Sequence, residues 1–116
     1  MTSLSSSFDD EQYQDHILQG VSRTFALTIP QLPESLRRVI GNAYLLCRIT
    51  DTIEDDSALT MEQTRQLSHM FSEVVCGNAS AEDFAQKLHP LLSGHTIPAE
   101  HDLVKNTPAV IRITHS

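Results

Sequence analysis

The stretch YLLCRITDTIEDD, residues 44–56, decides how this sequence is read, because an apolar helical segment runs directly into a cluster of acids. Four carboxylates fall within its last six positions. When residues 33–55 are projected as a helix at about 100° per residue, five side chains share one stripe. In chain order these are Ile40, Tyr44, Arg48, Asp51 and Asp55. The stripe therefore begins apolar and ends charged.

The acidic end of this stripe is also the predicted C-terminus of the helix, where the helix dipole disfavours carboxylates. Asp51 and Asp55 are one turn apart and repel one another, and Arg48 offsets only part of the charge. Carboxylates at this spacing present oxygens to the same space, and Mg²⁺ commonly binds one or two carboxylates together with substrate phosphates. The pattern favours a Mg²⁺–diphosphate site in which Arg48 contacts phosphate. A solvated acidic helix end is the alternative.

Composition indicates one all-α domain, since 40% of the 116 residues are hydrophobic and no segment alternates apolar and polar residues for long. A net charge of −7 argues against nucleic acid as a partner. Cys47 and Cys76 stand apart, which favours a reduced cytoplasmic setting over a disulfide scaffold, and we expect Cys47 to be buried. No secretory signal or membrane-spanning run is expected, because no apolar run approaches about 18 residues. Peripheral membrane contact stays open.

Turn and capping signals divide the chain into a series of helices. Thr60 and Gln63 predict a capping box, and Ser80 predicts a second N-cap. Thr107 followed by proline predicts the start of a last helix, with a frayed tail as the alternative. The expected helices cover residues 9–19, 22–29, 33–55, 61–76, 81–92 and 99–106. We expect a disordered tail over residues 1–7 and one partial helical domain over residues 8–116.

The segment VSRTFALTIPQLPESLRRVIGNAYLLCRITDTIEDD, residues 21–56, resembles the N-terminal part of the squalene/phytoene synthase family of head-to-head prenyl synthases. YLLCRITDTIEDD is similar to the first aspartate-rich motif of that family, with its preceding Tyr and Arg. SRTF, at residues 22–25, is similar to an upstream Ser-x-Ser-Phe-type element. The likeness is strong over residues 15–56 and weaker over residues 96–113, TIPAEHDLVKNTPAVIRI.

The resemblance implies an all-α bundle around an apolar cavity. Family members condense two prenyl diphosphates, such as farnesyl diphosphate, head to head through a cyclopropyl diphosphate with Mg²⁺. Squalene synthases then reduce that intermediate with NADPH. The run DTIEDD favours the squalene type, with a phytoene or dehydrosqualene synthase-like chain as the alternative.

The resemblance also assigns roles to individual residues. It implies that the carboxylates bind Mg²⁺, that the arginines contact diphosphate or the phosphate of the nicotinamide cofactor, and that Tyr44 steers the carbocation. Arg23 would be a second basic contact near Ser22 and Thr24, and Phe25 would line the cavity. The implied metal ligands are Asp51, Glu54 and Asp55, and the implied substrate or cofactor contacts are Ser22, Arg23, Thr24, Phe25 and Arg48.

One departure from the family concerns the second aspartate-rich motif, which faces the first across the cavity. After Asp56 the acids are scattered and form no comparable motif: Glu62, Glu73, Glu82, Asp83, Glu100 and Asp102. We therefore expect a truncated, squalene synthase-like N-terminal portion that is inactive alone. Two alternatives remain open. A second polypeptide could complete the fold, or the chain could be a non-catalytic acidic helical module that binds a protein partner or a cation.

Overall fold

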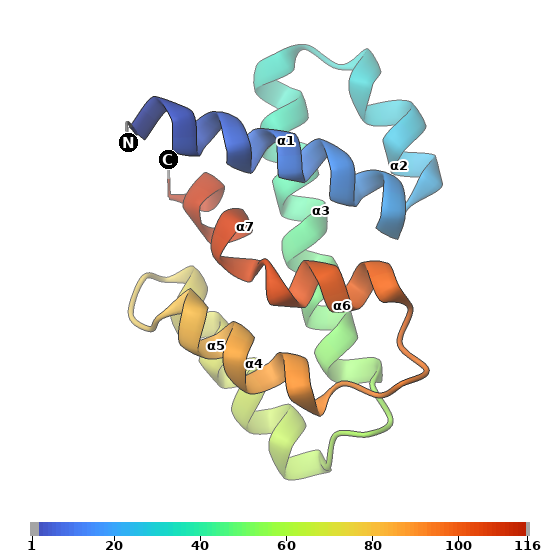
Figure 1. Cartoon of the computed structure of the whole chain (residues 1–116), viewed down its shortest axis with the longest axis vertical. Coiled ribbons are helices and arrows are strands. Elements are labelled where there is room, and N and C mark those ends of the chain that lie inside the picture. The colour runs from blue at the N-terminus through green and yellow to red at the C-terminus, as the bar shows by residue number, and fades with distance from the viewer. Residues whose placement is uncertain (1–2, 116) are drawn as a thin grey trace.

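The long helix α3, Glu34–Asp55, runs along the long axis of the structure, and α1 and α6 cross in front of it in Figure 1. The computed structural model describes residues 3–115, and the side chains of residues 3–8, 23, 26 and 29 are not described. Within residues 3–115 there is no strand, which confirms the predicted all-α class. The other elements are α1 (Ser3–Val21), α2 (Arg23–Thr28), η1 (Ile29–Gln31), α4 (Met61–Val75), α5 (Ala81–Leu88), η2 (His89–Leu91), α6 (Pro98–Lys105) and α7 (Thr107–Thr114).

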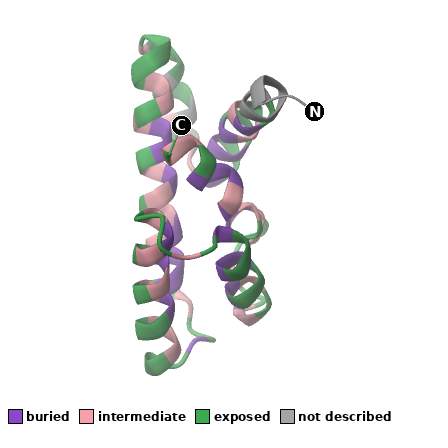
Figure 2. Ribbon diagram, turned by 90° about the vertical axis from the view of Figure 1, so that its left-hand side faces the viewer, coloured by how far each residue is buried: buried purple, intermediate pink, exposed green. Residues whose placement is uncertain are grey.

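The buried residues lie between the helices, while exposed residues cover the outer sides (Figure 2). From α3 the core takes Leu45, Ile49 and Ile53, all with no exposed surface. These positions are four residues apart, so they form one apolar stripe on the inner side of the helix. Other elements add buried apolar side chains to the same core, among them Ile17, Leu67, Phe71, Phe84, Leu88 and Leu103.

The predicted capping signals of the middle helices are confirmed. The backbone N–H of Gln63 donates to the Thr60 hydroxyl (3.1 Å), and the backbone N–H of Thr60 donates to the Gln63 side-chain oxygen (2.9 Å). This capping box pairs two N–H groups that the first turn of a helix otherwise leaves without partners. The Ser80 hydroxyl similarly accepts from the backbone N–H of Asp83 (3.2 Å). The predicted starts of α4 and α5 are therefore confirmed.

The C-terminus of α4 depends on Gly77, which has a φ of +87°. Its N–H donates to the Val74 carbonyl (3.1 Å), and the N–H of Asn78 donates to the Glu73 carbonyl (2.8 Å). This is the Schellman arrangement, in which a glycine adopts the left-handed conformation without steric cost. The predicted GN stop after residue 76 is thus correct to within one residue.

The two ends of the described chain pack together, since α7 lies against α1 (Figure 1). Thr107 and Val110 of α7 are buried, at 0% and 1% exposure, so the predicted helix start is confirmed and the frayed-tail alternative is wrong. At the other end, α1 begins at Ser3, whereas the sequence predicted a helix from Asp9. The proposed boundary between a tail and a domain near residue 7 stays a prediction.

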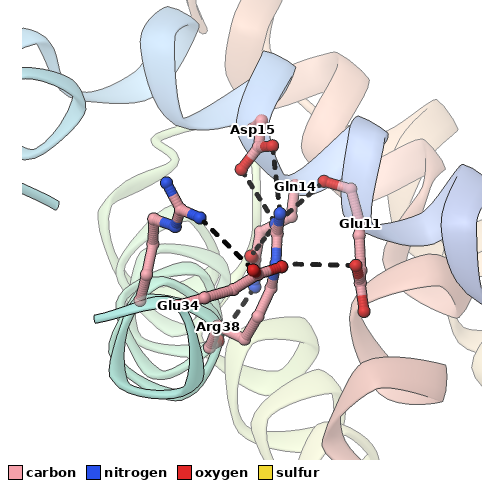
Figure 3. Close-up of polar contacts among 6 residues, drawn as sticks. Glu11, Gln14, Asp15, Glu34 and Arg38 are labelled. Atoms are coloured by element: carbon pink, nitrogen blue, oxygen red, sulfur yellow. Dashed lines mark hydrogen bonds and ion pairs between the residues drawn. The ribbon is translucent and has the colours of Figure 1, made fainter. Parts of the chain in front are cut away.

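Arg38 joins α3 to α1 through several hydrogen bonds (Figure 3). Its Nη1 donates to the Glu11 carbonyl (3.1 Å), to Gln14 Oε1 (2.9 Å) and to Asp15 Oδ1 (2.8 Å). Gln14, only 1% exposed, returns a bond from Nε2 to the Arg38 carbonyl (3.1 Å). Nearby, Gly41 lets α1 approach closely, because a Cβ there would lie 3.1 Å from the Leu18 side chain. These contacts fix the rotation of α3 about its own axis.

The predicted burial of Cys47 is wrong, because its side chain is exposed. It lies on the outer side of α3 together with Val39, which is 66% exposed, and Ala43. This side is opposite Leu45 and Ile49, so apolar neighbours in the sequence did not indicate the inner face. Among residues 3–115, no helix is both long enough and apolar enough to cross a bilayer.

Candidate functional site

The structure divides the predicted stripe on α3 into a sheltered half and an exposed half. Ile40, Tyr44 and Arg48 are half-buried, whereas Asp51 and Asp55 are exposed. The stripe lies at the edge of the helix–helix interface rather than in its centre. Its apolar part therefore meets other helices, and its acidic part faces solvent.

Phe25 packs directly on Tyr44, as a shared site would require. The ring centroids are 4.3 Å apart and the planes are inclined by 27°. The Tyr44 hydroxyl donates to the carbonyl of Val21 at the end of α1 (3.4 Å). Tyr44 is thus held between the start of α2 and the end of α1, and the two rings present a stacked aromatic surface.

The neighbours of Phe25 in the sequence differ in their exposure and contacts. The Ser22 hydroxyl accepts from the backbone N–H of Phe25 (3.2 Å), so it acts as the N-cap of α2. Thr24 is exposed, and its carbonyl accepts from the Thr28 hydroxyl (2.8 Å). The side chain of Arg23 lies outside the described residues. The structure therefore brings Phe25 to the stripe and gives Ser22 a capping contact.

Arg48 forms an ion pair with Glu100, which comes from the first turn of α6. Arg48 Nε lies 3.1 Å from Glu100 Oε2, and Nη2 contacts the same oxygen. Partial burial lowers the pKa of Arg48, but the hydrogen bonds and charge of Glu100 outweigh this and hold that pKa above its usual value. Arg48 is therefore a permanent cation one turn before the acidic end.

Asp56 differs from the other acids of the motif because it is already paired. Its Oδ2 accepts from the Thr96 hydroxyl (2.6 Å) and from the backbone N–H of Ser93 (2.9 Å), while Oδ1 accepts from the backbone N–H of Ala58 (2.8 Å). Partial burial raises the pKa of Asp56, yet these bonds, with a contribution from His101, lower it overall. Asp56 thus fastens the loop before α6 to the end of α3.

Asp51, Glu54 and Asp55 are all exposed, and no hydrogen bond or ion pair engages their carboxylates within the described part of the chain. Three unpaired hard oxygen ligands at the end of one helix fit Mg²⁺. Across residues 3–115, however, no three acidic, histidine or cysteine side chains converge as a metal-binding group. The arrangement fits an ion that takes one or two protein carboxylates and completes its shell with phosphate and water.

A pocket of 240 Å³ opens beside this acidic end, between α3 and the loop that leads to α6. Most of the residues that line it are of polar types, and the full set is Thr52, Asp55, Asp56, Ser57, Ser93, His95, Thr96, Ile97 and Glu100. The sequence did not indicate Glu100 or Thr52 as parts of this region. The sequence feature that could have indicated Glu100 is the segment TIPAE, residues 96–100. This segment begins the weaker stretch of family likeness, and it places a glutamate in the first turn of a helix.

Comparison with known proteins gives a match to the family model described as squalene/phytoene synthase, over residues 18–104. The matched region includes α2, α3 and the ion pair between Arg48 and Glu100. It thus covers most of the chain and every residue of the candidate site. No solved structure matches this chain significantly.

Several curated relatives also match. A Botryococcus squalene synthase from Botryococcus braunii is 46% identical over 57 residues, which are 49% of this chain and 12% of the relative. A squalene synthase from Solanum lycopersicum is 51% identical over 43 residues, 37% of this chain and 10% of the relative. A lycopaoctaene synthase from Botryococcus braunii is 41% identical over 58 residues, 50% of this chain and 13% of the relative. The matched segments are thus a small part of each relative.

Proposed function

Because this chain belongs to the squalene/phytoene synthase family, we propose that its acidic helix end binds a prenyl diphosphate through Mg²⁺ as one half of a squalene synthase-type site. The observation that carries this proposal is the set of carboxylates of Asp51, Glu54 and Asp55, which have no partner among the described residues and follow the permanent cation Arg48 within about two helical turns. Along α3 the stripe changes from apolar at Ile40 and Tyr44 to charged at Arg48 and the acids. A prenyl diphosphate changes in the same way, from a hydrocarbon chain to a charged diphosphate.

In this proposal Asp51 and Asp55, with Glu54, hold the ion, and Arg48 contacts the diphosphate oxygens. When bound, Mg²⁺ would neutralise charge on the diphosphate as the bond between the allylic carbon and oxygen breaks. Arg48 stabilises the same developing negative charge from the protein side, because it stays protonated throughout. The binding of the leaving group is therefore shared between carboxylates and one guanidinium.

Phe25 and Tyr44 would meet the hydrocarbon end of the substrate. Tyr44 lies one turn before Arg48 on α3 and Phe25 stacks on it, so a prenyl chain that extends from the diphosphate toward the start of α3 would lie near the two rings. Aromatic faces carry partial negative charge and attract cations. The two rings would therefore exclude water from an allylic carbocation and stabilise it.

Turnover would need a second carboxylate cluster, because the 116 residues contain one aspartate-rich motif. We propose that a second polypeptide or further sequence supplies it. NADPH, the product and the prenyl chain length stay predictions from the family likeness, as does peripheral membrane contact. The names of the relatives include both squalene synthase and lycopaoctaene synthase, so these partial matches favour the squalene type without separating products.

The test is incubation of the 116-residue protein with farnesyl diphosphate, Mg²⁺ and NADPH, with bound ligand and extracted products measured together. We expect farnesyl diphosphate to be retained only when Mg²⁺ is present, and no squalene to form. Formation of squalene would contradict the half-site proposal. Absence of Mg²⁺-dependent retention would contradict the binding function and favour a protein-interaction module.

A further inference from the structure

Glu100 contacts α3 through both of its carboxylate oxygens. Oε2 accepts from Arg48 Nε (3.1 Å) and from Nη2, while Oε1 lies 3.3 Å from the Thr52 hydroxyl. That hydroxyl also lies within hydrogen-bond distance of the Arg48 carbonyl (2.9 Å), and Thr52 is only 4% exposed. Arg48 and Thr52 are one helical turn apart on α3. Glu100 therefore bridges two fixed points of one helix.

The ion pair between Arg48 and Glu100 is sheltered from solvent. The side chain of Glu100 is 18% exposed and that of Arg48 is 30% exposed. By contrast, the pair between Arg65 and Glu62 on α4 has side chains that are 75% and 56% exposed. Long side chains in sheltered, charge-assisted pairs keep one geometry better than exposed pairs, which solvent and salt weaken. The Arg48 guanidinium is thus fixed before any ligand arrives.

The residue that holds this guanidinium, rather than Arg48 itself, lines the pocket beside the acidic end of α3. Glu100 and Thr52 line the same pocket as Asp55, so the carboxylate that holds Arg48 is next to the acidic end of α3. A guanidinium carries five N–H donors, and Glu100 contacts only the edge formed by Nε and Nη2. The opposite edge, at Nη1, is outside this ion pair.

We propose that Glu100 is a positioning residue for the diphosphate site: it holds Arg48 by one edge, so that the other edge of the guanidinium faces a diphosphate bound at Asp51 and Asp55. The inference rests on the proposed function and adds α6 to the site. A pre-fixed Arg48 loses little side-chain freedom on binding, and that loss otherwise weakens affinity by about 2- to 10-fold for each flexible side chain.

The negative charge of Glu100 also has an opposite effect, because it repels a diphosphate. Two variants separate the effects. Glu100→Ala removes both the charge and the contact with Arg48, whereas Glu100→Gln removes the charge and keeps an oxygen that can accept from Arg48. If positioning dominates, Glu100→Ala binds a diphosphate more weakly than the wild type, and Glu100→Gln lies between them. If repulsion dominates, both variants bind more tightly.

The experiment measures Mg²⁺-dependent binding of inorganic pyrophosphate to the 116-residue chain by titration calorimetry. Wild type, both Glu100 variants, Arg48→Ala and the double variant Arg48→Ala with Glu100→Ala are compared. We expect Glu100→Ala to weaken binding by about 2- to 10-fold, and to have no such effect when Arg48 is already alanine. A structural role for Glu100 would give the same weakening in both backgrounds, and that result would overturn the inference.

Two further outcomes keep this inference separate from the proposed function. If the wild type binds pyrophosphate with Mg²⁺ and Glu100→Ala binds equally well or more tightly, positioning is wrong and the proposed site stands. If the wild type shows no Mg²⁺-dependent binding, the site and the positioning role both fail. Should Glu100→Ala not fold, Glu100→Gln decides, alone and combined with Arg48→Ala: weaker binding only when Arg48 is present supports positioning, and unchanged or tighter binding overturns it.

Discussion

Arg112 of α7 forms two parallel hydrogen bonds to the carboxylate of Asp10 in α1, from Nε to Oδ2 (2.7 Å) and from Nη2 to Oδ1 (2.8 Å). The two residues are 102 positions apart in the chain. Asp10 is only 6% exposed. Its hydrogen bonds raise the pKa of Arg112, and this effect outweighs partial burial of the guanidinium, which lowers that pKa. This pair therefore ties the last helix of the described chain to the first.

Arg112→Ala is expected to lower the free energy of unfolding by about 1–3 kcal/mol, because it leaves the carboxylate of Asp10 buried without its charged partner. Urea denaturation measures the change. Arg65→Ala is the matched control, since its pair with Glu62 is exposed and should contribute about 0–1 kcal/mol. Equal losses in the two variants would show that burial of Asp10 does not decide the effect.

The stack of Phe25 on Tyr44 should contribute a coupling energy of its own. A double-mutant cycle with Phe25→Leu and Tyr44→Leu is expected to give a coupling of about 0.5–1.5 kcal/mol in the free energy of unfolding, the range for stacked aromatic pairs. Leucine keeps an apolar side chain at each position, so the cycle reports the ring contact rather than loss of burial. Additive losses would mean that the rings are not packed together in solution.

Acid should weaken the fold partly through Asp56. Its pKa is lower in the folded protein than its ordinary value, so the folded state binds this proton less tightly than the unfolded chain does. Asp56 therefore contributes stability that is fully present above its pKa in the unfolded chain, about 4. This contribution is lost as the pH falls through the lower pKa that Asp56 has in the folded protein. Thermal unfolding of wild type and Asp56→Asn, measured from about pH 6 downward, checks this.

We expect Asp56→Asn to be less stable than the wild type near neutral pH, and the difference to shrink as the pH falls below about 4. Other carboxylates titrate in both proteins. The difference in stability between the wild type and the variant therefore reports on Asp56 alone. A difference that stays constant across this range would show that the Asp56 carboxylate does not sustain the loop through Ser93 and Thr96.

Much of the fold could be predicted from local signals, because caps and turns act over three or four residues. The capping box at Thr60, the N-cap at Ser80 and the stop at Gly77 are read directly from residue type and spacing. The start of the first helix could not be predicted in this way. This helix begins at Ser3, before the acidic turn that suggested a start at Asp9.

The grouping of site residues could be predicted from the sequence when the residues lie on one helix. It could not be predicted when they come from different helices. The order of Tyr44, Arg48, Asp51 and Asp55 follows from helical periodicity alone. The partner of Arg48 is 52 positions away, so Glu100 could be found only once α6 was placed against α3. The exposure of Cys47 was missed for a related reason, since tertiary contacts decide which apolar side of α3 is buried.

The most direct test of the central claim is the affinity of the 116-residue protein for inorganic pyrophosphate, measured with and without Mg²⁺ for the wild type and for Asp51→Asn with Asp55→Asn. The control combines Glu82→Gln with Asp83→Asn, which removes the same charge from exposed acids on α5. We expect Mg²⁺-dependent binding in the wild type and the control, and a loss of more than about tenfold in the α3 variant. Equal affinity in all three proteins, or no effect of Mg²⁺ on the wild type, would contradict the account.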